Sequence, residues 1–410
     1  MYHDHHFHPM GYAALINGLE LMNAAGLDEV MAMLARHAGE VEGPIIGQRF
    51  NDEGVREGRL PTAADLDDVI SDRPVLLYRY CGHIAVANSV ALALAHISED
   101  TVDPDGGSFD RTSSGRPNGI LRETAIPLVS QALAPITPPP TDAEILSALE
   151  RLPAMGIGSV TGIISVGESI WCGVEDELET LTRLADDLPI DVDVLVIAET
   201  PSELERAKER IDRAEGRVRF HGYKDFTDGS LGGHTAAMYE PFSDAQTIGT
   251  VRIQHEKALL LGQTSLDLGG VVAIHAIGDR ANDLALDVHE ELIQGGADPG
   301  RLRIEHASIL TDETIDRMAR LGVVASVQPA FLASEETWLE KRLGPLRMSR
   351  AYPFRSMMEA GIPLLGGSDS PVELPDPETG INAAVVRHGI NPEQAMSRED
   401  AEAIFAPPKR

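Results

Sequence analysis

The chain of 410 residues contains 65 acidic residues against 34 lysines and arginines, which gives a net charge of −31 at pH 7. This charge disfavours nucleic acid as a partner, because proteins that bind a polyanion usually present a basic surface. Hydrophobic residues make up 43% of the chain, which is enough for a large buried core and argues against a disordered protein.

Three further features of the sequence indicate where the protein is located. No apolar run approaches the roughly 18 to 20 residues that span a bilayer, and the first residues, MYHDHHFHPM, lack a secretory pattern. The two cysteines, Cys81 and Cys172, are too few for a disulfide framework and fit a reducing compartment. We therefore expect a cytoplasmic protein with no membrane association.

The amino-terminal segment places His6 and His8 two residues apart. In an extended strand these side chains project from the same face, so both imidazoles can reach one metal ion. Taken alone, the segment is also compatible with a leftover affinity tag or a solvated polar terminus. The metal interpretation therefore requires further candidate ligands elsewhere in the chain.

Residues 40–140 differ in composition from the rest, since they are rich in Gly, Pro and Asp around one clear strand at residues 74–79. Unsupported loops of this length are usually functional. We predict that residues 40–140 form an insertion or lid after the first element of a barrel, which the next part of the sequence indicates. The proline run of residues 138–140 is the expected boundary between insertion and barrel.

From about residue 145, helical patterns alternate with short apolar runs, which is typical of βα units around a parallel sheet. The predicted helices cover residues 142–152, 174–187, 201–215, 280–294 and 312–321. The predicted strands cover residues 190–197, 218–223, 270–274, 302–304, 323–327 and 362–365. This order predicts an α/β barrel or a doubly wound sheet.

Polar residues follow several of these strand-like runs, namely Lys224, His275, His306 and Asp369. Active sites of parallel barrels are assembled at the carboxyl ends of the strands. Each residue also has a structural interpretation: a hydrogen-bonded histidine, a surface lysine, or an aspartate that caps a helix before Pro371. The agreement of all four positions with one barrel rule favours a functional site.

The sequence contains DHHFHP, LPTAADLD, RPVLLYRYCGHIAVANSVAL, DPDGGSF, GRPNGILRE, KDFTDGSLGGHTAA, AIHAIGDRA, RIEHA, SVQPAF and GGSDSPVE, in this order, from residue 4 to about residue 390. With these motifs it resembles the amidohydrolase superfamily, most closely the YtcJ-like branch that includes N-substituted formamide deformylases. The resemblance implies a TIM-type (β/α)8 barrel over residues 1–410, with the insertion of residues 40–140 after the first strand.

Members of this family usually carry a small β-sandwich on both sides of the barrel sequence. Here Met1 stands three residues before Asp4, and the chain stops at APPKR. The comparison implies that the sandwich is missing, either because the sequence is a trimmed or mis-started form, or because this member closes its barrel in another way. A partner chain, as in a homo-oligomer, is one such way.

The resemblance also implies roles for the candidate residues. His6 and His8 would bind a buried metal ion, Lys224 would bridge two ions as a carboxylated lysine, and His275 and His306 would bind the second ion. Asp369 would bind metal and serve as the general base. His and carboxylate ligands suit Zn²⁺, as one or two ions, although iron or manganese also fits.

Further residues match the family near the substrate. His83 is expected to orient a substrate carbonyl or else to be structural, Asp228 to contact the substrate or order the lysine loop, and Arg280 to pair with a substrate carboxylate. His234 and Gln328 also fall in matched motifs. Trp171 and Trp338 are expected either to line the pocket or, more simply, to pack in the core or lid.

The implied function is hydrolysis of an amide-type or formamide-type C–N bond in a small molecule, through a metal-activated hydroxide. Two alternatives stay open. An impaired or truncated barrel would act as a binding or regulatory protein, and the same metal site would also serve an ester, lactone or phosphoester hydrolase, because a metal-bound hydroxide attacks several electrophiles.

Overall fold

A computed structural model describes residues 1–138, 140–166 and 176–408 and divides the chain into two compact units. Of the described residues, the barrel unit comprises 1–9, 146–166 and 176–408. The insertion unit comprises residues 10–138 and 140–145. Of the helices in the described ranges, none has both the length and the apolar composition needed to cross a membrane.

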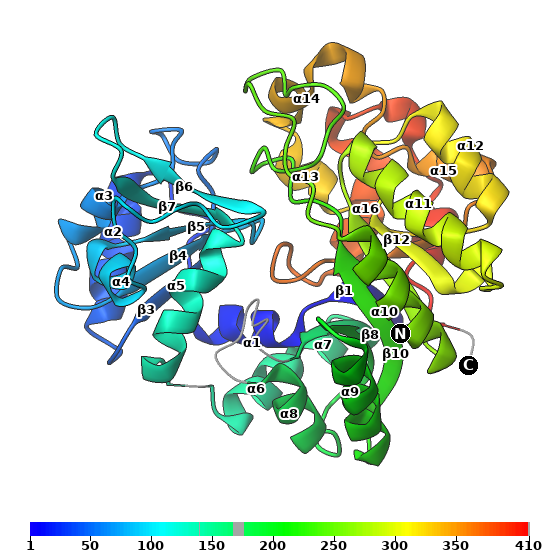
Figure 1. Cartoon of the computed structure of the whole chain (residues 1–410), viewed down its shortest axis with the longest axis horizontal. Coiled ribbons are helices and arrows are strands. Elements are labelled where there is room, and N and C mark those ends of the chain that lie inside the picture. The colour runs from blue at the N-terminus through cyan, green and yellow to red at the C-terminus, as the bar shows by residue number, and fades with distance from the viewer. Residues whose placement is uncertain (139, 167–175, 409–410) are drawn as a thin grey trace. The chain divides into compact units, whose positions relative to one another are not determined.

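The barrel unit contains an eight-stranded sheet in the order β1-β8-β9-β10-β11-β12-β13-β14, with neighbouring strands parallel (Figure 1). The strands are β1 (Tyr2–Phe7), β8 (Ile157–Ser165), β9 (Asp191–Ile197), β10 (Val218–Phe226), β11 (Val271–Ala276), β12 (Leu302–His306), β13 (Val324–Val327) and β14 (Leu364–Gly366). The predicted TIM-type (β/α)8 barrel is confirmed.

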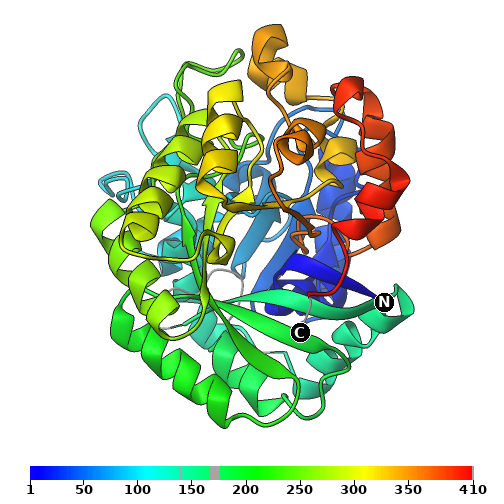
Figure 2. The same cartoon turned by 90° about the vertical axis from the view of Figure 1, so that its right-hand side faces the viewer.

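The barrel closes where β1 meets the segment that follows β14. Phe7 and Ser370 form a parallel bridge, and the Asp369 amide donates to the His6 carbonyl at 2.7 Å. At the other end of this seam, the His3 amide donates to the Phe405 carbonyl at 2.8 Å. Figure 2 shows β1 in dark blue beside the teal strand β8, with the red carboxyl-terminal segment passing close to it.

Helices of the barrel unit follow the strands as the βα pattern predicts. They are α7 (Arg151–Ala154), α8 (Glu177–Arg183), α9 (Pro201–Arg213), α10 (His255–Asp267), α11 (Asp279–Gln294), α12 (Asp312–Leu321), α13 (Phe331–Glu335), α14 (Leu339–Met348), α15 (Phe354–Glu359), α16 (Pro377–Val386) and α17 (Arg398–Ala403). Helix α6 (Asp142–Leu149) spans the boundary between the units.

Local sequence explains where these helices begin and what they bury. In α9, Thr200 and Glu203 form a reciprocal capping box and Pro201 occupies the first turn. Its buried residues recur at helical spacing, Leu204, Ala207 and Ile211, so one stripe faces the sheet while the charged residues face solvent. Such helices cover the barrel and leave the carboxyl ends of the strands for the site.

The insertion unit has its own six-stranded sheet in the order β2-β3-β4-β5-β7-β6. The strands are β2 (Leu19–Glu20), β3 (Ile45–Phe50), β4 (Val75–Arg79), β5 (Ile84–Ala87), β6 (Gly107–Arg111) and β7 (Pro117–Glu123). Its helices are α1 (Pro9–Asn17), α2 (Leu27–Ala38), α3 (Ala63–Asp67), α4 (Ser89–Leu94) and α5 (Ala125–Leu133).

This unit differs from the expected loop-rich insertion of residues 40–140. It begins at Met10, because residues 19–34 pack in the same hydrophobic cluster as residues 45–86. It also contains six strands where the sequence indicated one. The unit therefore has its own hydrophobic core and is wider than the expected insertion of residues 40–140, while the assignment of residues 1–410 to a single barrel domain stays a prediction.

Candidate metal centre

Three buried side chains converge at the seam where the barrel closes. His6 lies near the end of β1 and His8 follows this strand, while Asp369 follows β14. Asp369 Oδ1 lies 3.2 Å from His6 Nε2 and 3.1 Å from His8 Nε2. All three residues are at most 7% exposed. The spacing of His6 and His8 therefore places both imidazoles against one carboxylate.

His306, the last residue of β12, completes the most compact cluster. The ligand atoms of His6, His306 and Asp369 all lie within 4.8 Å of one another, and all three residues are buried. The His275 ring, on β11, lies with its centroid 4.4 Å from that of His306. Four predicted ligands from β1, β11, β12 and the segment after β14 thus meet at the carboxyl end of the barrel.

Lys224 on β10 is buried but makes different contacts. Its Nζ donates to the Asp225 carbonyl at 3.2 Å and lies 3.6 Å from the centroid of the Phe226 ring. Burial lowers the pKa of Lys224 to about 7, although nearby carboxylates including Glu305 oppose this shift. A neutral amine is therefore accessible near physiological pH, which is the form that reacts with CO₂.

The charge states of the cluster fit a divalent cation. Burial raises the pKa of Asp369, but His6 and His8 outweigh it and hold this pKa well below its usual range. Burial and the neighbouring His275 and His6 hold the pKa of His306 well below its usual value. Burial opposes protonation of His6, but Asp369 and Glu305 outweigh burial and raise the pKa of His6. An ionised carboxylate beside imidazole nitrogens is a donor set that zinc-type ions accept, once the imidazoles are deprotonated.

Glu305 is a site residue that the sequence motifs did not single out. Its Oε2 lies 2.6 Å from His6 Nδ1, and its Oε1 accepts a hydrogen bond from Arg303 Nε at 2.8 Å. Gln328 makes the corresponding contact to the other cluster histidine, with Oε1 2.7 Å from His306 Nδ1. The sequence does contain one indication of this role: Arg303 and Glu305 are a charged pair within an otherwise apolar strand that ends at His306.

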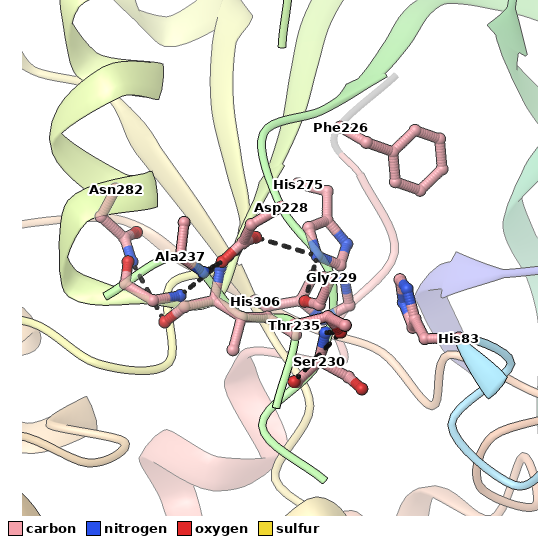
Figure 3. Close-up of polar contacts among 12 residues, drawn as sticks. His83, Phe226, Asp228, Gly229, Ser230, Thr235, Ala237, His275, Asn282 and His306 are labelled. Carbon is pink, nitrogen blue, oxygen red and sulfur yellow. Dashed lines mark hydrogen bonds and ion pairs between the residues drawn. The ribbon is translucent and has the colours of Figure 1, made fainter. Parts of the chain in front are cut away.

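Asp228 orders the site from within the protein (Figure 3). Its Oδ1 lies 3.2 Å from His275 Nε2 and accepts from the Ile277 amide, while Oδ2 accepts from the Ala237 and Gly278 amides. The side chain is completely buried. The sequence left two roles open for Asp228: a contact to the substrate, or ordering of the loop that follows Lys224. Both carboxylate oxygens contact protein groups, so the geometry favours the ordering of His275 and this loop.

The remaining predicted residues are described by their own contacts. Arg280 is the second residue of α11 and is half-buried. His83 belongs to the insertion unit, where its Nδ1 lies 2.9 Å from Glu123 Oε2, and its role toward a substrate carbonyl stays a prediction. His234 lies 3.0 Å from Asp244 Oδ1. Trp338 is buried and donates to the Ser334 carbonyl, as expected of a packing residue.

Trp171 and Cys172 lie outside the described residues. Cys81 is a buried free cysteine.

Comparisons with known proteins place this chain in a family. The family model described as "Amidohydrolase family" matches residues 3–406. YtcJ of Bacillus subtilis (strain 168), a candidate amidohydrolase, is 31% identical over 407 residues, covering 98% of this chain and 75% of YtcJ. The N-substituted formamide deformylase of Arthrobacter pascens is 28% identical over 400 residues, covering 93% of this chain and 72% of that enzyme.

A solved structure is also similar. The crystal structure of an uncharacterized metal-dependent hydrolase from Pyrococcus horikoshii OT3 matches with a TM-score of 0.75 and 30% identity. The match covers 98% of this chain and 79% of the other.

Proposed function

Because the chain belongs to the amidohydrolase family, it is a hydrolase, and we propose that it cleaves an amide-type or formamide-type C–N bond of a small molecule at a divalent metal centre. The observation that carries the proposal is the convergence of His6, His306 and Asp369, whose ligand atoms lie within 4.8 Å of one another. The similarity to an N-substituted formamide deformylase supports the choice of bond.

In this proposal His6, His8 and Asp369 hold one ion, and His275 and His306 contribute to a second. A bound zinc-type ion supplies a water of lowered pKa and polarises the substrate carbonyl. Lys224 in its neutral form would add its amine to CO₂ and release a proton, which would leave a carbamate with two anionic oxygens as further ligands for the metal centre. One ion without this carbamate is the alternative.

Asp369 is the proposed general base. It accepts the proton of the attacking water while the water oxygen bonds to the substrate carbon, and it delivers that proton to the nitrogen as the C–N bond breaks. A formamide would yield an amine and formate. Arg280, at the start of α11, is proposed to pair with a carboxylate on the substrate.

The test combines metal analysis with a substrate panel. Protein expressed with zinc is expected to retain at least one equivalent of metal, and to hydrolyse N-formyl or N-acyl amides. His275→Ala should lower both values, while His255→Gln, which alters a half-buried histidine at the start of α10 that contacts Glu291, should lower neither. Turnover of esters without any turnover of amides would refute the choice of bond. Less than half an equivalent of metal, unchanged in His275→Ala, would indicate a binding protein instead.

A further inference from the structure

We propose that Glu305 and Arg303 on β12 act together as positioning residues that hold His6 in the orientation and tautomer needed to bind a metal ion. The inference rests on the proposed metal centre, but it concerns two residues that the catalytic proposal does not use. Three features support it: the contacts of Glu305, the contacts of Arg303 and the way in which the pair connects two ligands.

Glu305 is a completely buried carboxylate with one partner on each oxygen. Oε2 lies 2.6 Å from His6 Nδ1, and Oε1 accepts from Arg303 Nε at 2.8 Å. Because neither oxygen has to compete with bulk water, these contacts restrict the carboxylate to one orientation. The arrangement therefore fixes the His6 ring relative to the backbone of β12.

Arg303 reaches β1 independently of this carboxylate. Its Nη2 donates to the His5 carbonyl at 2.9 Å, and its Nη1 lies 3.3 Å from His221 Nε2 on β10. Strands β12 and β1 are separated in the sheet by β13 and β14, so the two side chains cross the barrel interior. Arg303 thus holds the backbone of β1 immediately before His6, while Glu305 holds the His6 ring.

The same pair couples two ligands of the cluster. His306 follows Glu305 directly in β12, so one short stretch of backbone carries a ligand and the residue that orients another ligand. When a neutral His6 donates its Nδ1–H to the Glu305 carboxylate, its Nε2 lone pair would be available to a metal ion, and Asp369 Oδ1, 3.2 Å from this nitrogen, would be a ligand of the same ion. Partners of this kind fix the tautomer of metal-binding histidines and raise their basicity.

A neutral side chain at position 305 would hold His6 and Arg303 less well than the Glu305 carboxylate does. The carboxylate only accepts hydrogen bonds, so it suits both the His6 N–H and the Arg303 N–H. A carboxamide of the same shape has one acceptor oxygen and one donor NH₂ group, and can satisfy only one of them. Gln328 provides a natural comparison, because its neutral amide contacts His306 without a second charged partner on its oxygen.

The experiment measures metal affinity in Glu305→Gln by competition with a chelating dye, using Zn²⁺. We expect affinity to fall about 10- to 100-fold, and the visible spectrum of the Co²⁺-substituted protein to change. Tyr352→Phe is the matched control, because it removes a buried hydrogen bond of 2.6 Å to Glu335 in the same unit. We expect this control to lower stability with no change in metal affinity.

A second measurement does not need metal. In metal-free protein at alkaline pH, ¹⁵N NMR of histidine-labelled protein should show the His6 proton on Nδ1 in the wild type, with the signal assigned by its loss in His6→Gln. Glu305→Gln should shift this proton toward Nε2. If Glu305→Gln fails to fold, Arg303→Lys serves in its place, because it keeps the charge and removes the forked contact to Glu305 and His5.

The outcomes separate the two proposals. Wild-type protein that binds no metal, yet shows His6 protonated on Nδ1, would refute the metal centre and leave the positioning contact standing. Unchanged Zn²⁺ affinity in Glu305→Gln, or a wild-type His6 proton on Nε2, would refute the positioning role.

Discussion

His289 on α11 is a buried histidine whose burial makes folding sensitive to acid. Its side chain is completely buried, and across the described parts of the chain neither ring nitrogen has a hydrogen-bond partner. Burial lowers the pKa of His289 from 6.5 to about 3. Between these two values the unfolded chain binds a proton at this residue and the folded chain does not, so stability falls as pH decreases.

The size of this effect can be worked out from the shift. At about pH 5 the unfolded imidazole is 1.5 pH units below its pKa of 6.5, while the folded imidazole is still neutral. At about 1.4 kcal/mol per unit, the loss of stability is about 2 kcal/mol relative to neutral pH. His289→Leu removes the ionisable group and keeps a similar side-chain volume, so the variant should not show this loss.

The assay is urea denaturation of the wild type and His289→Leu between about pH 8 and pH 5. The difference in unfolding free energy should grow by about 2 kcal/mol toward the acidic end in favour of the variant. Other titrating groups, including the metal centre, are common to both proteins and cancel in the difference. His255→Gln, which replaces a half-buried histidine that contacts Glu291, is the control for substitution of a histidine as such. Equal slopes for the wild type and His289→Leu would refute the reasoning.

Three further predictions concern the site and the strand that carries Lys224. His306→Ala removes a buried ligand and should reduce Zn²⁺ affinity by more than the roughly 100-fold typical of outer-shell changes, as measured by chelator competition. Native mass spectrometry should show one CO₂ added at Lys224 above about pH 7 and its loss below that pH, where the amine is protonated; an unmodified lysine in metal-loaded protein contradicts the bridge. Gly222→Ala would place a Cβ 2.2 Å from the Val271 carbonyl oxygen and should cost more than about 3 kcal/mol on urea denaturation, whereas Gly269→Ala, with open space at its positive φ, should cost about 1 to 2 kcal/mol.

Much of the barrel could be predicted from local sequence. The apolar runs at residues 190–197 and 302–304 correspond to β9 and β12, because strands covered on both faces are nearly continuous in Val, Ile and Leu. Strand β8 was missed, since its sequence IGSVTGIIS mixes small and polar residues. The insertion sheet was also missed, because its short strands depend on pairing with one another across Gly-rich turns.

The convergence of the candidate ligands could be predicted from their positions after strands, but the partners of these side chains could not. Glu305 contacts a histidine 299 residues away in sequence, and no local pattern specifies that contact. For Asp228 the sequence left two roles open, because its backbone donors come from loops whose conformation the sequence does not reveal. Local sequence spacing predicts the position of a residue along a strand. The long-range contacts of its side chain depend on the tertiary structure.

The seam between β1 and the segment after β14 has a consequence for how the protein is made. His8 and Asp369 lie 361 residues apart in sequence, yet they contact each other across the seam. On the ribosome His6 and His8 emerge before their carboxylate partner Asp369, which follows His8 by 361 residues. The proposed ligand cluster therefore cannot assemble in a nascent chain that ends before Asp369, so metal capture by the complete cluster would have to follow synthesis of all eight barrel strands.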